Sequence, residues 1–370
     1  MAIIPKSNLF ILEGIKMTKT AIVSSPKYLL HKTGPHHPET PSRLRVISRE
    51  LNKSGILTNE KCTLLNPDPI NLNELKLVHK TDYINQIKRF CRTGGGLLDH
   101  EDTVASPESY EVALLAAGGT TKAANLVMSG RYKNAFAFVR PPGHHAGTDY
   151  AMGFCIFNNV AVAASNLIEK FDLKRVLILD IDAHHGNGTQ EIFYKNNKVL
   201  YVSLHEDPID FPLKGFANEL GKEEGLGFTV NIPLPYETDD KIYLRAFNEI
   251  VTPIIKQYKP QFILVSTGFD NHYSDPVGNL RLSSRSYLKI FDKLLELASQ
   301  SCQGKLVAVL EGGYNLRILG KLACAVTSKL ADIPYVIEDR PQGTVTKIRR
   351  KGEKTINQIK KTQSTFWKIE

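Results

Sequence analysis

The chain has 370 residues with a formal net charge of +9, and 42% of its residues are hydrophobic. No apolar run approaches the roughly 18 residues of a membrane span, so no membrane partner is expected. The five cysteines are odd in number and lack CxxC spacing, which predicts reduced thiols in a cytoplasmic protein rather than a disulfide framework.

The chain reads as one domain with a short leading segment. No linker or low-complexity run divides it, so residues 17–370 are expected to fold as a single unit. Residues 1–16 make a poor signal peptide, because their apolar stretch is short and no small-residue cleavage site follows. We expect a loose extension there, and Met17 is an alternative start.

Apolar stretches typical of buried strands alternate with segments of helical spacing. The expected strands are 20–24, 135–139, 176–179, 199–205, 228–232, 261–266 and 305–310. The expected helices are 42–51, with Ser42 as N-cap, 73–92, 111–129, one ending near 170, and 239–256. This alternation predicts an α/β fold with a largely parallel central sheet and helices on both faces.

The tail from 340 to 370 is basic, with nine Lys or Arg against two Glu. Such a segment could hold nucleic acid. Its apolar residues favour a helix that docks on the body instead; they are Ile356, Ile359, Phe366 and Trp367. We therefore expect a docked C-terminal helix and no nucleic-acid partner.

One stretch carries the densest chemistry, because the strand 176–179 runs into Asp180, Asp182 and His184. Side chains two apart on a strand share a face, so these three point the same way if the extended conformation persists to position 184. Two buried carboxylates require a counter-charge, and a divalent cation is the simplest one. The alternative is a strand that ends in a polar loop with exposed histidines.

Other polar groups also follow strands. The strands ending at 139, 266 and 310 are followed by His144 and His145, by Asp270, and by Tyr314. In a parallel sheet, ligands bind outside the carboxyl ends of the strands. We therefore expect these side chains to meet the acidic stretch at one edge of the sheet.

Together these residues have the composition of a catalytic metal site. Asp182, His184 and Asp270 supply the three protein ligands typical of such a site. The oxygen-rich set suits Zn²⁺, and Fe²⁺ would also be accommodated. Two histidines can move protons, and a tyrosine hydroxyl after two glycines can donate to an oxyanion. This is the equipment for hydrolysing an unactivated amide.

Five motifs then resemble the histone deacetylase superfamily, which includes deacetylase-like amidohydrolases, acetylpolyamine amidohydrolases and acetoin-utilisation proteins. They lie within about residues 20–330 and are His36-His37-Pro38-Glu39, Arg140-Pro-Pro-Gly-His144-His145-Ala146, the segment 180–188, Gly268-Phe269-Asp270 and Glu311-Gly312-Gly313-Tyr314. The resemblance implies a three-layer arginase-like fold, with Zn²⁺ held by Asp182, His184 and Asp270.

The resemblance also implies roles for the remaining polar groups. His145 would be general base and acid, His144 its electrostatic partner, and Tyr314 the donor that polarises the carbonyl. Asp180 would hold His144, and it also resembles a ligand of a structural monovalent cation, K⁺ or Na⁺. Asn187, where many members carry Asp, resembles the class II branch, and an amide there makes His145 less basic.

Substrate contacts are implied in the same way. Gly153 and Phe154 would line the acyl-lysine tunnel, and Phe211 would also bind substrate. Asp102 loosely matches the loop position that holds the substrate backbone. Val277 stands where polyamine-selective relatives carry an acidic residue, which weakens the case for a polyamine substrate.

We therefore expect a Zn²⁺-dependent amidohydrolase that removes acetyl or another short acyl group from a lysine side chain or a small amine. One alternative is a deacylase of polyamines or other small molecules. A non-catalytic acyl-group binder is disfavoured by the intact His144, His145 and Tyr314. An arginase-type dinuclear Mn²⁺ hydrolase needs more ligands than this set supplies. A homo-oligomer is compatible with the sequence.

Overall fold

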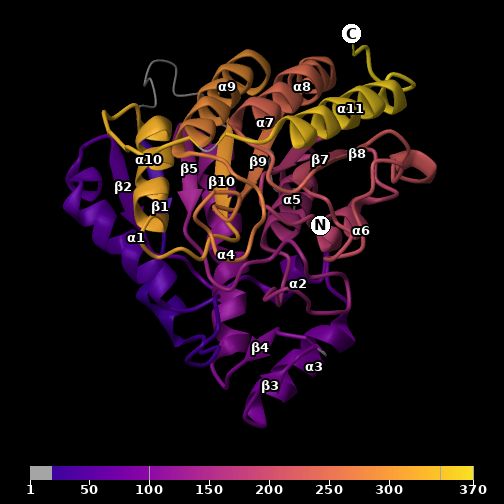
Figure 1. The fold of residues 1–370 in the computed structure, drawn as a ribbon. Coiled ribbons are helices and arrows are strands. Elements are labelled where there is room, and N and C mark those ends of the chain that lie inside the picture. The colour runs from indigo at the N-terminus through magenta and orange to yellow at the C-terminus, as the bar shows by residue number, and fades with distance from the viewer. Residues whose placement is uncertain (1–18, 100, 342, 370) are drawn as a thin grey trace, which may run out of the picture.

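The computed structural model describes residues 19–99, 101–341 and 343–369. Eight strands form one sheet in the order β2-β1-β5-β10-β9-β6-β7-β8, and all neighbouring pairs are parallel (Figure 1). The strands of this sheet are β1 Thr20–Val23, β2 Cys62–Leu65, β5 Asn134–Ala137, β6 Val176–Asp180, β7 Val199–Glu206, β8 Thr229–Leu234, β9 Phe262–Thr267 and β10 Leu306–Leu310. A separate antiparallel pair joins β3 Gly96–Leu97 to β4 Val104–Ala105.

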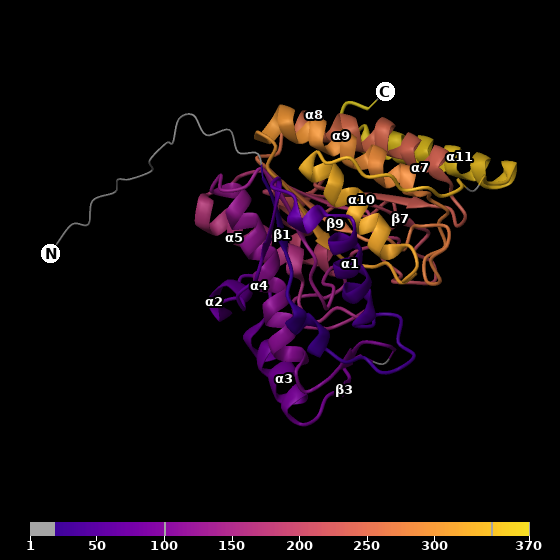
Figure 2. The same cartoon turned by 90° about the vertical axis from the view of Figure 1, so that its left-hand side faces the viewer.

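Helices cover both faces of this sheet. They are α1 Ser42–Lys53, α2 Leu72–Leu75, α3 Thr81–Arg92, α4 Ser109–Met128, α5 Asn159–Phe171, α6 Asn187–Phe193, α7 Asp240–Ala246, α8 Thr252–Tyr258, α9 Ser284–Cys302, α10 Leu319–Ala331 and α11 Thr346–Gln363. Figure 2 shows α4 and α5 on one side of the sheet and α8, α9, α10 and α11 on the other. None of the helices in the described ranges is long and apolar enough to cross a membrane.

The predicted α/β fold is confirmed. Strands β5, β6, β9 and β10 are buried along their whole length, because helices cover both of their faces. Strands in such a sheet are continuous apolar runs rather than alternating ones. This is why the sequence pattern located the central strands to within about two residues.

The predicted helix 73–92 is wrong, because the chain forms two helices, α2 and α3. Between them the backbone N–H of Lys80 donates to the carbonyl of Thr148 at 2.9 Å. The ring of the buried His79 accepts from the backbone N–H of Asn158, also at 2.9 Å. These contacts with a distant loop take the segment out of the helical hydrogen-bond pattern, a case of tertiary structure overriding local propensity.

Two further helix details differ from expectation. Pro41 occupies the N-cap of α1 and Ser42 is already helical, with no side-chain capping bond. The predicted helix 239–256 is divided by a π-helical turn, η4 Phe247–Val251. Pro253 follows that turn and has no N–H to donate to the preceding turn, so the regular pattern cannot pass through it. Strand β2, the β3–β4 pair and helices α6, α9 and α10 are additions to the predicted elements.

The sheet order brings the polar segments together. Strands β5, β10, β9 and β6 are consecutive neighbours, and all run in one direction. The loops that follow them therefore leave the same edge of the sheet at its centre. These loops contain His144 and His145, Tyr314, Asp270, and Asp182 with His184.

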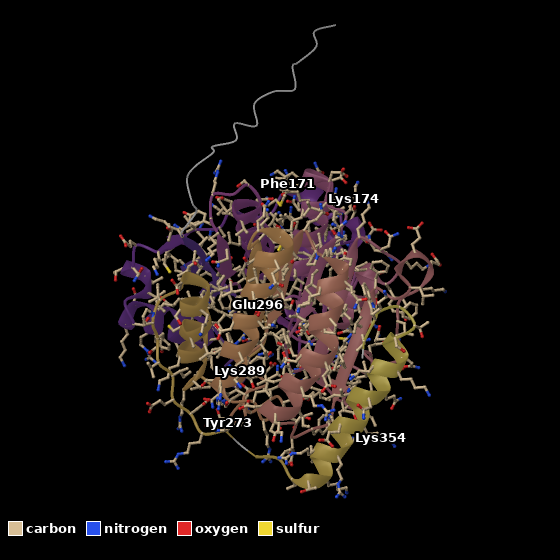
Figure 3. The ribbon with its side chains drawn as sticks, turned by 90° about the horizontal axis from the view of Figure 1, so that it is seen from above. Phe171, Lys174, Tyr273, Lys289, Glu296 and Lys354 are labelled. Carbon is tan, nitrogen blue, oxygen red and sulfur yellow. The ribbon has the colours of Figure 1, made fainter. Side chains whose placement is uncertain are left out.

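The basic C-terminal segment forms α11, which packs against β8 and α7. Ile356 and Ile359 are fully buried on its inner side. Beyond the helix, the indole N–H of Trp367 donates to the carbonyl of Gly227 at 3.1 Å. The exposed Lys354 lies on α11 in the view from above (Figure 3). The expected leading extension, 1–16, lies outside the described residues.

Replacing Ile359 by Ala is expected to lower the free energy of unfolding by about 2–5 kcal/mol, because it leaves a cavity beneath α11. Urea denaturation measures this change. Val345→Ala is the matched control, since Val345 is 60% exposed and should change stability little. Equal stability of the two variants would mean that α11 is a free arm in solution.

Candidate active site

Three side chains form a compact group outside the ends of β6 and β9. Ligand atoms of Asp182, His184 and Asp270 all lie within 4.8 Å of one another. His184 Nδ1 is 3.4 Å from Asp182 Oδ1 and 3.4 Å from Asp270 Oδ2. Asp270 Oδ2 is buried and has no hydrogen-bond donor within the described residues. The geometry thus brings together the three side chains predicted to bind a metal.

Backbone amides hold the two carboxylates in place. Asp182 Oδ2 accepts from the N–H of Gly312 at 2.8 Å, and Asp270 Oδ1 accepts from the N–H of Ala183 at 3.0 Å. A Cβ on Gly312 would lie 2.1 Å from Asp270 Oδ2, and one on Gly268 would lie 2.1 Å from Asp182 Oδ2. Glycine is therefore required at both positions for the backbone to approach the carboxylates this closely.

The electrostatics of the group call for a cation. Burial, followed by the nearby Asp182 carboxylate, raises the pKa of Asp270 to about 7. Burial would lower the pKa of His184, but the nearby Asp182 and Asp270 carboxylates outweigh it and raise that pKa well above its usual value. The protein alone thus stabilises a proton among these three groups. A divalent ion in the same place would neutralise both carboxylates, so the donor set fits a metal.

The pair His144 and Asp180 lies beside this group. Strand β6 ends at Asp180, so the extended conformation does not persist to 184, and Asp180 does not join Asp182 and His184. Its Oδ2 instead faces His144 Nδ1 at 3.0 Å and accepts from the Tyr201 hydroxyl at 3.1 Å. Burial would lower the pKa of His144, but Asp180 and Asp182 outweigh it and raise the pKa to about 10.

The neighbouring His145 is held in the opposite protonation state. Its Nδ1 lies 2.7 Å from Asn187 Oδ1, and the Asn187 amide N–H₂ group donates to the Tyr150 hydroxyl at 3.3 Å. Tyr150 in turn donates to Glu191 at 3.0 Å, which fixes the direction of this chain. Because an amide oxygen only accepts, Nδ1 of His145 carries the proton and Nε2 is left with a lone pair. Burial and the charge of His144 lower the pKa of His145 well below its usual value.

Tyr314 approaches from the end of β10. Its backbone N–H donates to Asp275 Oδ2 at 2.7 Å, and the Arg43 guanidinium lies 4.8 Å from the centre of its ring. Gly313 has a φ of 111°, a left-handed conformation that favours glycine, and this turn sets the direction of the tyrosine. Burial raises the pKa of the Tyr314 hydroxyl well above its usual value, so this group remains a hydrogen-bond donor at neutral pH.

Aromatic side chains stand beside the polar groups. The ring of Phe211 packs edge-on against His145 at 5.0 Å and against His184 at 5.7 Å. The ring of Phe154 lies 5.7 Å from that of Tyr314. A Cβ on Gly153 would lie 2.4 Å from the His145 ring, so only glycine allows that ring its position. These three predicted substrate-binding residues therefore lie next to the polar groups.

The two remaining predicted substrate residues lie on nearby loops. Asp102 is exposed, and its backbone carbonyl accepts from His37 Nε2 at 2.9 Å. The adjacent Thr103 hydroxyl accepts from the backbone N–H of Phe154 at 3.1 Å, which links this loop to the aromatic residues beside the polar groups. Val277 is half-buried, and its N–H donates to Asp275 Oδ1 at 3.0 Å. Their roles toward substrate stay predictions.

A buried ion cluster beneath the site was not predicted as a unit. Glu39 Oε1 accepts from Arg140 Nε at 2.7 Å and from Arg43 Nη1 at 3.1 Å. Arg43 also donates to the carbonyl oxygens of Gly313 and Glu311, on the backbone that leads to Tyr314. The motifs containing Glu39 and Arg140 were visible in the sequence, but their pairing across 101 positions was not.

Two further buried carboxylates were missed. Glu311 accepts from the backbone N–H of Gly143 at 2.7 Å, and so fixes the turn that carries both histidines. Glu206, the last residue of β7, has Oε1 3.7 Å from His184 Nε2. Asn279 holds Glu206 through its backbone N–H at 2.6 Å and its side-chain amide at 2.9 Å. The position of Glu206 at the carboxyl end of a strand is the signal that could have identified it.

The chain is similar to known proteins over most of its length. The family model described as "Histone deacetylase domain" matches residues 37–330. A probable deacetylase of Archaeoglobus fulgidus is 38% identical over 362 residues, which cover 94% of this chain and 99% of that protein. A histone deacetylase-like amidohydrolase of Pseudomonas aeruginosa is 34% identical, over 87% of this chain and 88% of that protein.

A plant relative shows the same likeness in sequence, and a crystal structure shows it in three dimensions. Histone deacetylase 15 of Arabidopsis thaliana is 38% identical over 95% of this chain, and the match spans 63% of the length of that protein. The crystal structure of the HDA15 HD domain superposes with a TM-score of 0.85 at 37% identity, covering 95% of this chain and 96% of that one. The similarity therefore extends far beyond the site motifs.

Replacing Glu206 by Gln is expected to weaken divalent-metal affinity by about 10–100-fold, because a carboxylate facing the second nitrogen of a metal-binding histidine orients that ring and raises its basicity. Competition with a chelator of known affinity measures the change. Glu224→Gln is a matched control, since Glu224 is exposed. Unchanged affinity in Glu206→Gln would show that Glu206 does not support His184.

Proposed function

Since this chain belongs to the histone deacetylase family and is a hydrolase acting on amides, we propose that it is a Zn²⁺-dependent deacetylase. Its substrate would be a lysine side chain or small amine that carries acetyl or another short acyl group. The observation that best supports this is the meeting of the Asp182–His184–Asp270 group with two differently protonated histidines.

The metal would be held by Asp182, His184 and Asp270, and the unsatisfied oxygen of Asp270 supports this assignment. When bound, Zn²⁺ or Fe²⁺ supplies Lewis acidity toward an amide carbonyl and makes water more acidic. A monovalent cation near Asp180 is part of the same proposal, and it rests on the resemblance of that residue alone.

The two histidines divide the proton chemistry. His145 has its free lone pair at Nε2, so it takes a proton from the attacking water and returns it to the leaving nitrogen. His144 stays protonated against Asp180, and its charge stabilises negative charge that develops beside it. The amide of Asn187 holds the His145 tautomer without accepting a proton itself.

Tyr314 supplies the hydrogen bond to the carbonyl oxygen. A hydroxyl whose pKa is raised keeps its proton and can donate as the oxygen gains charge. Asp275 fixes the backbone of the tyrosine, and Arg43 packs against its ring. The donor is therefore held near its working position before substrate arrives, which reduces the reorganisation that the reaction requires.

The aromatic residues beside the site favour a substrate with a long, thin acyl-amine chain. Phe154 and Phe211 would pack against its apolar part, next to His145 and Tyr314. A second candidate, a deacylase of cationic small amines, is supported by the exposed acidic residues Glu101 and Asp102 on the neighbouring loop. Val277 in place of an acidic residue favours the lysine substrate.

Tyr314→Phe is expected to lower kcat on an acetyl-lysine peptide by about 10²–10³-fold, because it removes one donor to the oxyanion. Zinc content, measured by atomic absorption, should remain unchanged. Tyr194→Phe is the matched control, since Tyr194 is the C-cap of α6 and lies outside the group of site residues. Full turnover by Tyr314→Phe would rule out the proposed mechanism.

Val277→Glu is expected to raise kcat/KM for acetylated polyamines about tenfold relative to acetyl-lysine peptides, since a carboxylate near the channel attracts a cationic chain. Val277→Gln has the same shape without the charge and should show no such shift. A side-by-side panel of acetylated peptides and acetylpolyamines measures this ratio. The same ratio in both variants would show that charge at position 277 does not determine substrate choice.

A further inference from the structure

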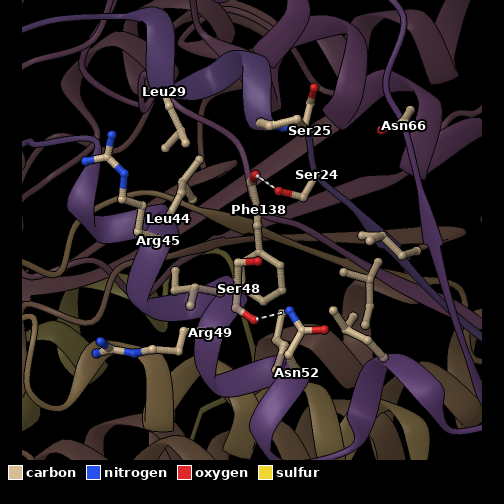
Figure 4. A pocket seen from close by; sticks show the side chains of 16 residues that line it. Ser24, Ser25, Leu29, Leu44, Arg45, Ser48, Arg49, Asn52, Asn66 and Phe138 are labelled. Atoms are coloured by element: carbon tan, nitrogen blue, oxygen red, sulfur yellow. Dashed lines mark hydrogen bonds between the residues drawn. The ribbon is translucent and has the colours of Figure 1, made fainter.

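A hollow lies away from the active site, between α1, the short helix η1 Pro26–Leu30 and strands β1 and β2 (Figure 4). Its volume is about 380 Å³. Its floor consists of the buried Ile22, Ile47, Leu51 and Phe138. None of the residues assigned above to metal, proton transfer or substrate lines this hollow.

Two polar side chains that line the hollow are already hydrogen-bonded to the backbone. The Ser24 hydroxyl donates to the carbonyl of Phe138 at 3.2 Å. The Asn52 side-chain amide donates to the carbonyl of Ser48 at 2.9 Å. Both bonds are drawn as dashed lines in Figure 4. Because these polar groups are engaged with the backbone, the interior is better suited to a hydrocarbon chain than to a polar ligand.

The charged residues that line the hollow are all positive. Arg45 and Arg49 line it, and no Asp or Glu does. Both are exposed, and Figure 4 shows both extending from α1 on the same side. Neither makes an ion pair with any part of the chain that the structure describes. Like charges four residues apart on a helix repel, so the pair gains from an anion that both can contact.

We propose that this hollow binds a medium-chain monocarboxylate, with the hydrocarbon chain on the floor and the carboxylate at Arg45 and Arg49. Guanidinium groups bind carboxylates through paired, charge-assisted hydrogen bonds. A volume of about 380 Å³ lies at the lower end of small-molecule sites, which suits one short chain rather than a two-chain lipid. The site is separate from the proposed deacetylase chemistry and does not depend on it.

The test measures binding of decanoate to the full-length, metal-loaded protein by isothermal titration calorimetry. We expect one site, with affinity that falls as salt is raised. Decanol, which has the chain without the charge, and decyltrimethylammonium, which reverses it, should bind at least about tenfold more weakly. Equal binding of decanol would overturn the proposal, because the arginines would then contribute nothing.

Variants locate the site. Arg45→Ala with Arg49→Ala should lower decanoate affinity about tenfold or more, whereas the exposed Arg131→Ala should leave it unchanged. Ser48→Trp places a large side chain at the lining from an exposed helical position, and it should abolish binding with deacetylase turnover unchanged. Full binding by Ser48→Trp would place decanoate elsewhere, including at the active-site metal, and would overturn the proposal.

A final experiment distinguishes binding of the free acid from binding to a membrane surface. The protein is sedimented with vesicles of phosphatidylglycerol in the presence and absence of decanoate. We expect no retention on the vesicles. Retention that requires Arg45 and Arg49, without binding of free decanoate, would overturn the proposal in favour of a lipid surface.

Discussion

Two buried carboxylates beside one imidazole are the constraint on which the rest of this structure depends. Asp182 and Asp270 are buried and repel each other, and burial together with that repulsion raises the pKa of Asp270. The backbone is shaped to keep them together regardless: amides of Gly312 and Ala183 bind them, and two glycines leave room for them. A fold that holds like charges this close is prepared for a cation.

The buried histidines and charges around the site have partners of different kinds. His144 has Asp180, whereas His145 has the amide of Asn187. Together with burial and the charge of His144, this difference keeps the two rings, whose centres are 4.0 Å apart, in different protonation states. Below them, Glu39 joins Arg140 and Arg43, and Arg43 donates to the carbonyl of Gly313, the residue before Tyr314. Removal of one member of such a buried cluster leaves a charge buried without a partner, which typically lowers protein stability by about 3–5 kcal/mol.

The sequence allowed the central strands and the site residues on them to be predicted, because a buried parallel strand is a continuous apolar run and its carboxyl end is where ligands bind. It did not reveal that Glu39 pairs with Arg140, or that Glu206 faces His184, since these contacts join segments far apart in the chain. The break between α2 and α3 has the same origin: Lys80 bonds to Thr148, and no local signal marks it.

The strand order also constrains when the site can form. β10 is the last strand in the described part of the chain, yet it lies between β5 and β9 at the centre of the sheet. A growing chain that has not reached Leu310 therefore has two unpaired parallel edges and lacks Gly312 and Tyr314. Pairing over such separations in sequence is slow, and open edges favour aggregation in the meantime. The site would thus be complete only after synthesis of the chain has passed Tyr314.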